Sequence, residues 1–328
     1  MQKQKIIIDP GSSYITIYGG GYVLREPNVC VIRRGNHIEL IAVGNDALKL
    51  KDLPEHCSLV FPVRDGVVVR PDVFAKLLEY YLNDIISFSI LNPVELYVLI
   101  PSSLSSAERE NFELAVQKTG HKDITLIESV LGLLPILGGS DNAVCIFGGG
   151  TTEIAVINNE GIVSACTVNI SGNTINEKIV EQVLKTYNLR ISNSTADKLK
   201  IGIGSLYDND LSVMTITGQD ILDGKVKNVE ISSNSLRAPI VWCYKKIAEL
   251  IESVLTTIPH SKIADVRVNG LYCAGAGANL GGLTDYLAKY LKLPIHLAPE
   301  PETIIVKGAY ELINDSSDKY AMILGNKR

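Results

Sequence analysis

The sequence predicts an α/β fold divided into two domains, and three observations predict it. The chain has 328 residues, which exceeds the size at which a single hydrophobic core usually stops growing. Apolar runs of strand length alternate with helical patterns, as in sheets that are covered by helices. One plan of strand, glycine-rich turn and strand occurs twice, at residues 5–18 and 143–157, which indicates an internal duplication.

Composition and charge exclude several classes of protein. Hydrophobic residues make up 46% of the chain and charged residues 20%, which is ordinary for a soluble globular protein. The formal net charge of -5 and the lack of a Lys/Arg cluster argue against nucleic-acid binding. The six cysteines form no Cys-x-x-Cys pair, so we expect free thiols rather than a zinc site or disulfides. Without a signal peptide or an apolar run that could span a bilayer, the sequence predicts a cytoplasmic protein.

The first glycine-rich turn consists of Gly11, Ser12 and Ser13, between an apolar strand and an alternating one. Such a turn presents main-chain N–H groups to a phosphate. Asp9 lies at the end of the first strand, where a carboxylate holds Mg²⁺ directly or through waters. An ordinary turn-forming role for Asp9 is the alternative.

The remainder of the first half alternates strands with helices. The predicted elements are short strands between residues 23 and 69, a helix at 72–82, a strand at 95–101, a helix at 106–119, a strand at 124–127 and an apolar helix after residue 129. Apolar residues recur at spacings of three and four in the helix at 72–82, and Pro71 suits its start. The continuous apolar run at 95–101 is typical of a strand buried on both faces.

The second glycine-rich turn, at the middle of the chain, consists of Gly148, Gly149, Gly150, Thr151 and Thr152. A tight hairpin without a ligand is the alternative interpretation. The matching pattern near the N-terminus favours phosphate binding.

The second half continues the alternation. We expect a strand at 161–170, helices at 176–187 and from 194, a β-rich insertion at 212–231, a helix at 235–258, a strand at 270–273 and a helix at 283–288. Small residues precede the last helix, namely Gly275, Ala276, Gly277 and Ala278. They would let a flat or anionic ligand lie close to a helix N-terminus, and ordinary helix-on-sheet packing is the alternative explanation for them.

In this order the motifs resemble those of the actin-like ATPase superfamily, most closely its bacterial MreB branch. The resemblance covers nearly the whole chain and rests on residues 8–13, 25–29, 43–47, 62–67, 148–156, 195–204, 274–283 and 299–308. It implies an actin-like fold of two RNase H-like domains, each with a smaller inserted subdomain. Domain I would comprise residues 1–137 and 307–328 with a small β subdomain at about 28–70, and domain II residues 138–306 with a subdomain at about 173–240.

The resemblance also implies ligands and roles. ATP or ADP with Mg²⁺ would bind between the domains, with Asp9 at the metal and the two glycine-rich turns at the β- and γ-phosphates. Lys200 would lie on the nucleoside side, and residues 275–278 at the adenosine.

Departures from the family pattern concern hydrolysis. Ile146 and Phe147 stand where the family has Asp-Ile before the glycines, which removes an acidic group. Ser129 stands where the family has the second Glu of Ile-Glu-Glu-Pro, so Glu128 is the remaining catalytic candidate. Gly202 replaces a Glu that the family directs at the ribose. We therefore expect weak ATP hydrolysis, because loss of such preorganised groups costs on the order of a hundredfold in rate.

Location and partners follow from the same resemblance. Members of the family polymerise at the inner membrane face and help to set rod shape, so we expect self-association, a membrane surface and cell-shape membrane proteins as partners. Phe88, Ile90 and Leu91 resemble a membrane-inserting loop, and packing beneath a helix is the alternative. A non-filamentous nucleotide-binding scaffold and a small-molecule kinase are the alternative functions. The sequence leaves open ATP versus GTP and the polarity of protofilaments.

Overall fold

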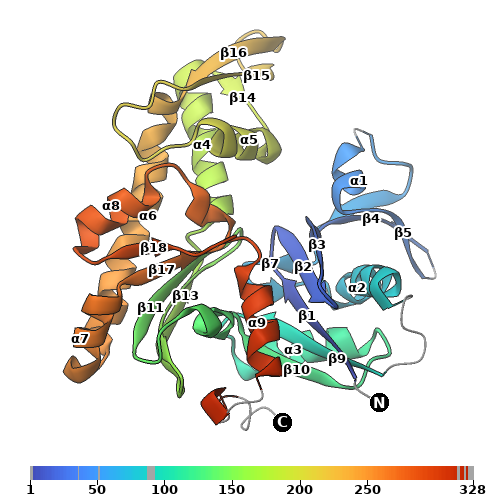
Figure 1. Ribbon diagram of the computed structural model, residues 1–328. Helices are drawn as coiled ribbons and strands as arrows, with labels where there is room; N and C mark the ends of the chain where they lie inside the picture. Colours follow the sequence, from blue (N-terminus) through green and yellow to red (C-terminus); the bar gives the residue numbers. More distant parts are fainter. Residues whose placement is uncertain are drawn as a thin grey trace. The chain divides into compact units, whose positions relative to one another are not determined.

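The computed structural model describes residues 3–35, 37–50, 52–86, 93–315, 318–320 and 323, and it confirms the α/β class. The chain forms two compact units (Figure 1). Unit 1 comprises residues 1–140, 157–167 and 302–328, and unit 2 comprises residues 141–156 and 168–301.

The large sheet of unit 1 has the strand order β10-β9-β1-β2-β3. Its strands are β1 (Gln4–Pro10), β2 (Tyr14–Gly19), β3 (Tyr22–Pro27), β9 (Val94–Ile100) and β10 (Ile124–Glu128). β1 and β10 run parallel to β9, whereas β2 is antiparallel to both β1 and β3. The carboxyl ends of the three parallel strands therefore meet at one edge, where ligands commonly bind to α/β sheets.

Successive side chains of β1 point to opposite faces of the sheet, and helices pack on both faces. Ile6 and Ile8 join a core with side chains of α2 (Pro71–Ile86) and α3 (Ser106–Gln117), which lie on the same face (Figure 1). Ile7 and Asp9 point to the opposite face, because successive strand residues alternate. On that face Tyr18 of β2 contacts Tyr310 of α9 (Ile304–Asn314), with ring centroids 5.0 Å apart.

A close contact between main chains joins α9 to the 3-10 helix η1 (Ser129–Ile136). Neither Gly132 nor Gly308 has room for a Cβ atom: the space beside Gly308 is filled by the Gly132 carbonyl, and that beside Gly132 by the Ile305 carbonyl. The sequence predicts an ordinary apolar helix here. The structure has a 3-10 helix instead, and Pro135 lies within it, where it cannot donate a main-chain hydrogen bond.

Smaller elements complete unit 1. They are β4 (Cys30–Arg34), β5 (Ile38–Val43) and β6 (Cys57–Val60) in one sheet, α1 (Gly44–Lys49), the pair β7 (Val63–Arg64) and β8 (Val67–Val68), and η3 (Asp318–Tyr320).

The second large sheet has the order β13-β12-β11-β17-β18. Its strands are β11 (Asn142–Phe147), β12 (Thr152–Asn158), β13 (Gly161–Val168), β17 (Leu271–Ala274) and β18 (Ile295–Leu297). In the division into units, nearly all of β13 is counted with unit 1. The other elements of unit 2 are α4 (Gly172–Tyr187), α5 (Asn193–Ile203), α6 (Ser233–Thr257), α7 (His260–Asn269), η2 (Ala276–Asn279), α8 (Leu283–Leu291) and a small sheet of β14 (Leu189–Arg190), β15 (Val213–Asp220) and β16 (Val226–Ser232). The predicted β-rich insertion at 212–231 is thus confirmed as the hairpin β15–β16.

Two further expectations concern thiols and membranes. The six cysteines are free, as expected, and four of them are buried. In the part of the chain that the structure describes, no helix is long and apolar enough to cross a bilayer.

Candidate functional site

The first glycine-rich turn connects β1 to β2 and is held by hydrogen bonds to residues of two other segments. Asn28 donates from Nδ2 to the Gly11 carbonyl at 2.8 Å, and its own N–H donates to the Ser13 carbonyl at 2.9 Å. Ser12 is buried, and its Oγ accepts a hydrogen bond from the Gly66 N–H at 3.0 Å. A Cβ atom on Gly11 would come within 2.8 Å of the Tyr14 carbonyl, so this turn needs glycine.

Asp9 is partly buried at the end of β1, directly before this turn. Burial raises the pKa of its carboxyl to about 6, and the positive charge of Arg25 acts in the opposite direction. Among the described residues no group of three or more His, Cys, Asp or Glu side chains could hold a metal ion. A magnesium site here would therefore rest on Asp9 together with phosphate and water oxygens, which is the usual mode for nucleotide-bound Mg²⁺.

The second glycine-rich turn joins β11 to β12 and is tied to the start of α4. The Gly148 N–H donates to the Thr151 carbonyl at 3.0 Å, which closes the turn. Gly172 and Asn173, the first residues of α4, donate their N–H groups to the carbonyls of Gly148 and Gly149 at 3.0 and 2.8 Å.

The main-chain carbonyls of Gly148, Gly149 and Thr151 thereby accept hydrogen bonds, whereas three N–H groups of the turn have no such partner. In the described part of the chain, the N–H groups of Gly149, Gly150 and Thr151 donate to no main-chain carbonyl. Thr152 is buried and donates from Oγ1 to the Ile170 carbonyl at 2.6 Å, so it anchors the turn. A row of such N–H groups is suited to an anion, and the turn fits a phosphate.

Lys200 of α5 is held firmly inside unit 2. Its Nζ donates to Asp197 Oδ1 at 2.7 Å, to Asn176 Oδ1 at 2.8 Å and to the Gly172 carbonyl at 3.1 Å. Gly172 in turn bonds to the second glycine-rich turn, so Lys200 is connected to that turn through the first turn of α4. Its role at the nucleoside stays a prediction.

The small residues after β17 lie against the end of β11. Gly275 has a φ of +83°, and a Cβ there would come within 2.5 Å of the Phe147 carbonyl. A Cβ on Gly277 would come within 2.9 Å of the Phe147 Cβ. Tyr244 of α6 donates from its hydroxyl to the Gly277 carbonyl at 2.9 Å. Ala276 is exposed and Ala278 is buried.

The residues that depart from the family pattern are integrated into the packing. Ile146 and Phe147 are 6% and 2% exposed, and Phe147 contacts the Tyr244 ring with centroids 5.7 Å apart. Gly202 of α5 leaves the space that the methyl end of Met214 of β15 fills. Ile146 and Gly202, the two of these positions at which the resemblance implies an acidic residue, thus lie in apolar surroundings.

Glu128, the catalytic candidate, ends β10 at the same sheet edge as Asp9. Its Oε1 lies 3.1 Å from Nη1 of Arg109 of α3. Ser129, the next residue, is buried and donates from Oγ to the Ile100 carbonyl at 3.1 Å, so it offers no carboxylate.

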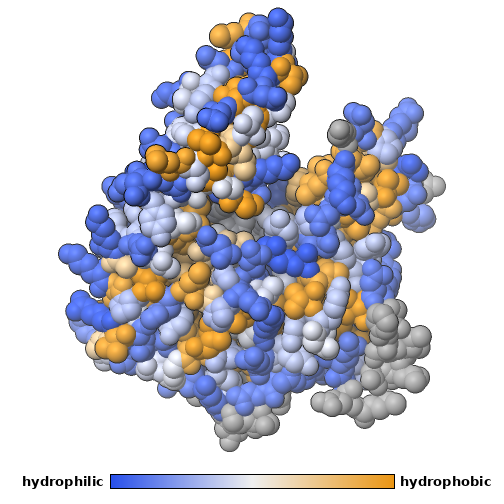
Figure 2. Space-filling view, turned by 45° about the horizontal axis from the view of Figure 1, so that its top comes forward, coloured by the Kyte–Doolittle hydropathy of each residue, from blue (hydrophilic) through white to orange (hydrophobic). Residues whose placement is uncertain are grey.

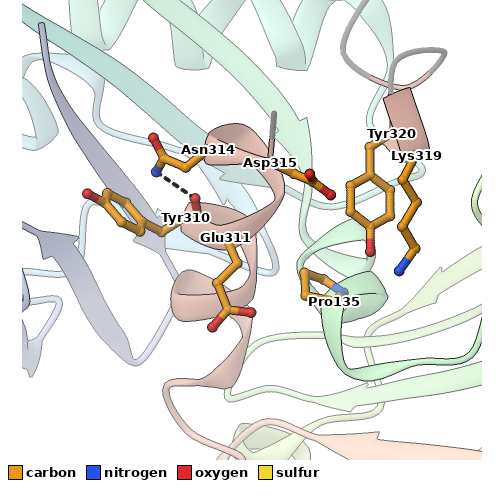
Figure 3. Close-up of a pocket in the computed structure, with 7 residues that line it drawn as sticks. All are labelled: Pro135, Tyr310, Glu311, Asn314, Asp315, Lys319 and Tyr320. Atoms are coloured by element: carbon orange, nitrogen blue, oxygen red, sulfur yellow. Dashed lines mark hydrogen bonds between the residues drawn. The ribbon is translucent and has the colours of Figure 1, made fainter. Parts of the chain in front are cut away.

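A cavity of about 460 Å³ lies elsewhere in unit 1. Figure 3 shows its lining: Pro135, Tyr310, Glu311, Asn314, Asp315, Lys319 and Tyr320. None of the predicted site residues lines it. The predicted membrane loop residues Phe88, Ile90 and Leu91 lie outside the described residues.

Sequence reasoning missed several residues that build this site. Asn28, Arg109, Asn176 and Tyr244 each contact a predicted site residue from an element distant in sequence. Asp197 is the exception, since its spacing of three from Lys200 on one helix was visible.

Comparison with known proteins assigns the family. The MreB/Mbl protein family matches residues 3–320. The chain belongs to the MreB/Mbl family. It is 29% identical to the cell shape-determining protein MreB of Escherichia coli strain K12, with 96% of this chain and 95% of that protein covered. It is 27% identical to the cell shape-determining protein Mbl of Bacillus subtilis, with coverage of 97% and 98%.

Solved structures agree with this assignment. MreB5 of Spiroplasma citri, bound to ADP, is 25% identical with a TM-score of 0.87, covering 98% of this chain and 99% of that one. The MamK double helical filament subunit, 18% identical, has a TM-score of 0.77 over 96% of this chain and 100% of that one, and supports the fold alone. The predicted actin-like fold is confirmed, as is the identification as an MreB-like cytoskeletal actin homologue with a role in cell shape.

Proposed function

We propose that this MreB/Mbl protein binds ATP or ADP with Mg²⁺, assembles into filaments at the inner face of the cell membrane, and hydrolyses ATP slowly. The second glycine-rich turn carries the nucleotide part of the proposal, because N–H groups of Gly149, Gly150 and Thr151 have no main-chain carbonyl partner in the described residues. The MreB5 protein of Spiroplasma citri was crystallised with ADP and with AMPPNP, which supports the same ligand class here.

Each predicted site residue has a proposed role. Gly11, Ser12 and Ser13 would bind phosphate, and so would residues 148–152. Asp9 would hold the magnesium ion, and Glu128 would orient the attacking water. Lys200 and residues 275–278 would line the nucleoside. Mg²⁺ would neutralise charge on the phosphates.

Slow hydrolysis follows from the carboxylates that are missing. Ile146 and Ser129 stand where the resemblance implies carboxylates, and neither side chain is acidic. Ile146 is buried in β11, and Ser129 donates its hydroxyl to the Ile100 carbonyl. Glu128, the remaining carboxylate, forms an ion pair with Arg109. Binding depends on main-chain groups and is retained, whereas the step that activates water loses its organising groups.

Self-assembly is supported by exposed apolar side chains. Ile201, Leu211, Leu222 and Val226 of unit 2 are each at least 74% exposed. Apolar surface is also visible in separate patches among hydrophilic side chains in Figure 2. Apolar side chains mark a binding surface where they form a contiguous patch, and in a member of the MreB/Mbl family a second copy of the chain is the partner that filament assembly requires.

One experiment tests both parts. Purified protein is imaged by negative-stain electron microscopy with ATP, with AMPPNP and without nucleotide, and phosphate release is measured in the same samples. The MreB of Escherichia coli, assayed in parallel, sets the reference rate. We expect filaments with ATP and AMPPNP, and phosphate release at least tenfold below the reference. Persistent monomers would contradict filament assembly, and a rate equal to the reference would contradict slow hydrolysis.

A further inference from the structure

Arg25 of β3 occupies an unusual place beside the first glycine-rich turn. It pairs with Thr16 of β2, which pairs with Asp9 of β1, so the three residues form one row across the sheet. Directly opposite strand residues point to the same face. Arg25 therefore shares a face with Asp9, and their main chains are about 10 Å apart, or two strand spacings.

The guanidinium of Arg25 is held between two groups. It stacks over the Tyr14 ring, with its Cζ 3.8 Å from the ring centroid, and Tyr14 directly follows the turn. Its Nη1 lies 3.2 Å from Oε2 of Glu302. The Arg25 charge is also close enough to favour the ionised form of the Asp9 carboxylate.

A buried polar side chain, Asn28, holds the turn. Asn28 is fully buried and uses its Nδ2 to hold Gly11, but its Oδ1 has no hydrogen-bond partner among the described residues. A buried amide oxygen without a partner costs about 1–3 kcal/mol, and a bound water or ligand donor would remove that cost. Oδ1 accepts hydrogen bonds and a phosphate oxygen donates none, so Asn28 holds the turn and the guanidinium of Arg25 is the group suited to a phosphate.

We propose that Arg25 is a further phosphate-binding residue for a triphosphate at Gly11, Ser12 and Ser13, and that Glu302 and the terminal phosphate compete for its guanidinium. This inference rests on the proposed nucleotide binding. Arginine suits the role, because its planar fork matches phosphate oxygens and it stays charged at any physiological pH. The Tyr14 ring, over which the guanidinium stacks, adds a favourable cation–π contact beside the turn.

The test measures affinity for AMPPNP, ADP and adenosine by isothermal titration calorimetry in the presence of Mg²⁺. For Arg25→Gln we expect about tenfold weaker AMPPNP binding, a smaller loss for ADP and no change for adenosine, since a charged hydrogen bond to phosphate is lost. Arg25→Lys keeps the charge without the fork, and we expect an intermediate loss.

Glu302→Gln separates phosphate binding from loss of the ion pair. It breaks the same pair but leaves the guanidinium, so AMPPNP affinity should be equal to or a few-fold tighter than that of wild type. Arg33→Gln is the matched control, because Arg33 forms an exposed ion pair with Glu39 on a different sheet. Thermal unfolding of every variant checks that it is folded.

The outcomes distinguish the two proposals. Equal losses in Arg25→Gln and Glu302→Gln would assign the effect to the ion pair and overturn the role of Arg25. Unchanged AMPPNP affinity in Arg25→Gln would overturn it too, while nucleotide binding itself stands. If wild-type protein binds none of the three ligands, nucleotide binding fails and this inference fails with it.

Discussion

Glu128 at the end of β10 and Arg109 of α3 form an ion pair, with 3.1 Å between Glu128 Oε1 and Arg109 Nη1. Arg109 also donates from Nε to the Leu104 carbonyl at 3.4 Å, so the guanidinium is fixed at two points. The pair holds one carboxylate at the sheet edge where Asp9 also lies.

Removal of this carboxylate should abolish the residual hydrolysis. For Glu128→Gln we expect phosphate release to fall at least tenfold, as for loss of other groups that position a proton or a water. Glu113→Gln on the exposed side of α3 is the control and should leave the rate unchanged. An unaltered rate in Glu128→Gln would assign water activation to another group.

Gly277→Ala should destabilise unit 2. The new Cβ would lie 2.9 Å from the Phe147 Cβ and 3.1 Å from its carbonyl oxygen, so the chain must shift at a cost of about 1–3 kcal/mol. Urea unfolding measures the change. Ala276→Ser in the same helix is exposed and should stay within about 0.5 kcal/mol of wild type. If the two variants have equal free energies of unfolding, the chain around Gly277 and Phe147 adjusts to the new Cβ atom without cost, and the prediction is wrong.

Lys200→Met should lower stability by about 1–3 kcal/mol, because Asp197, Asn176 and the Gly172 carbonyl lose their shared donor. Because Gly172 holds the second glycine-rich turn, nucleotide affinity should fall as well. Lys198→Met, at an exposed position of the same helix, is the matched control and should match wild type in both measurements. A loss of affinity without a loss of stability would indicate direct contact with the nucleotide.

The raised pKa of Asp9 makes stability depend on pH. Burial favours the protonated carboxyl in the folded state, so the stabilising effect is complete below the unfolded pKa near 4 and is lost as pH rises through about 6. Asp9→Asn removes this dependence. Without nucleotide, we expect the variant to be more stable than wild type at pH 7.5 by up to about 3 kcal/mol and equal to it at pH 4. Parallel pH profiles of the two proteins would refute the assignment.

Membrane association can be tested at the predicted loop. Ile90→Ser combined with Leu91→Ser should reduce pelleting with liposomes several-fold, because apolar side chains supply the affinity of such loops. Leu114→Ser removes an exposed apolar side chain from α3 and serves as the control. Equal pelleting of the double variant and wild type would rule out insertion by this loop.

Much of the fold could be predicted because apolar periodicity is a local signal. The strand at 95–101 and the helices at 72–82 and 106–119 were correctly predicted for this reason. Helix α7 was not predicted, because it lacks the apolar periodicity that marks a packed helix. Val266 is the one residue of this helix that the structure buries. The 3-10 helix η1 packs its Gly132 against Ile305 and Gly308 of α9, a contact between residues far apart in the chain that no local pattern contains.

The same distinction between local and distant signals applies to the candidate site residues. The glycine-rich turns and Asp9 were recognisable as local motifs, but the groups that hold them come from distant elements. Gly202 shows the limit most clearly. The sequence indicates only the loss of an acidic side chain, whereas the structure shows that its absence makes room for Met214, twelve positions further along the chain.

The contact of Gly132 with the backbone of α9 has a consequence for mutational tolerance. Because a Cβ at Gly132 or at Gly308 would overlap a main-chain carbonyl, no exchange of rotamers can accommodate one. In a saturation library selected for folded protein, both codons should remain glycine while the apolar positions around them, such as Ile305, drift among residues of similar volume. Two residues without side chains would then be among the least replaceable in unit 1.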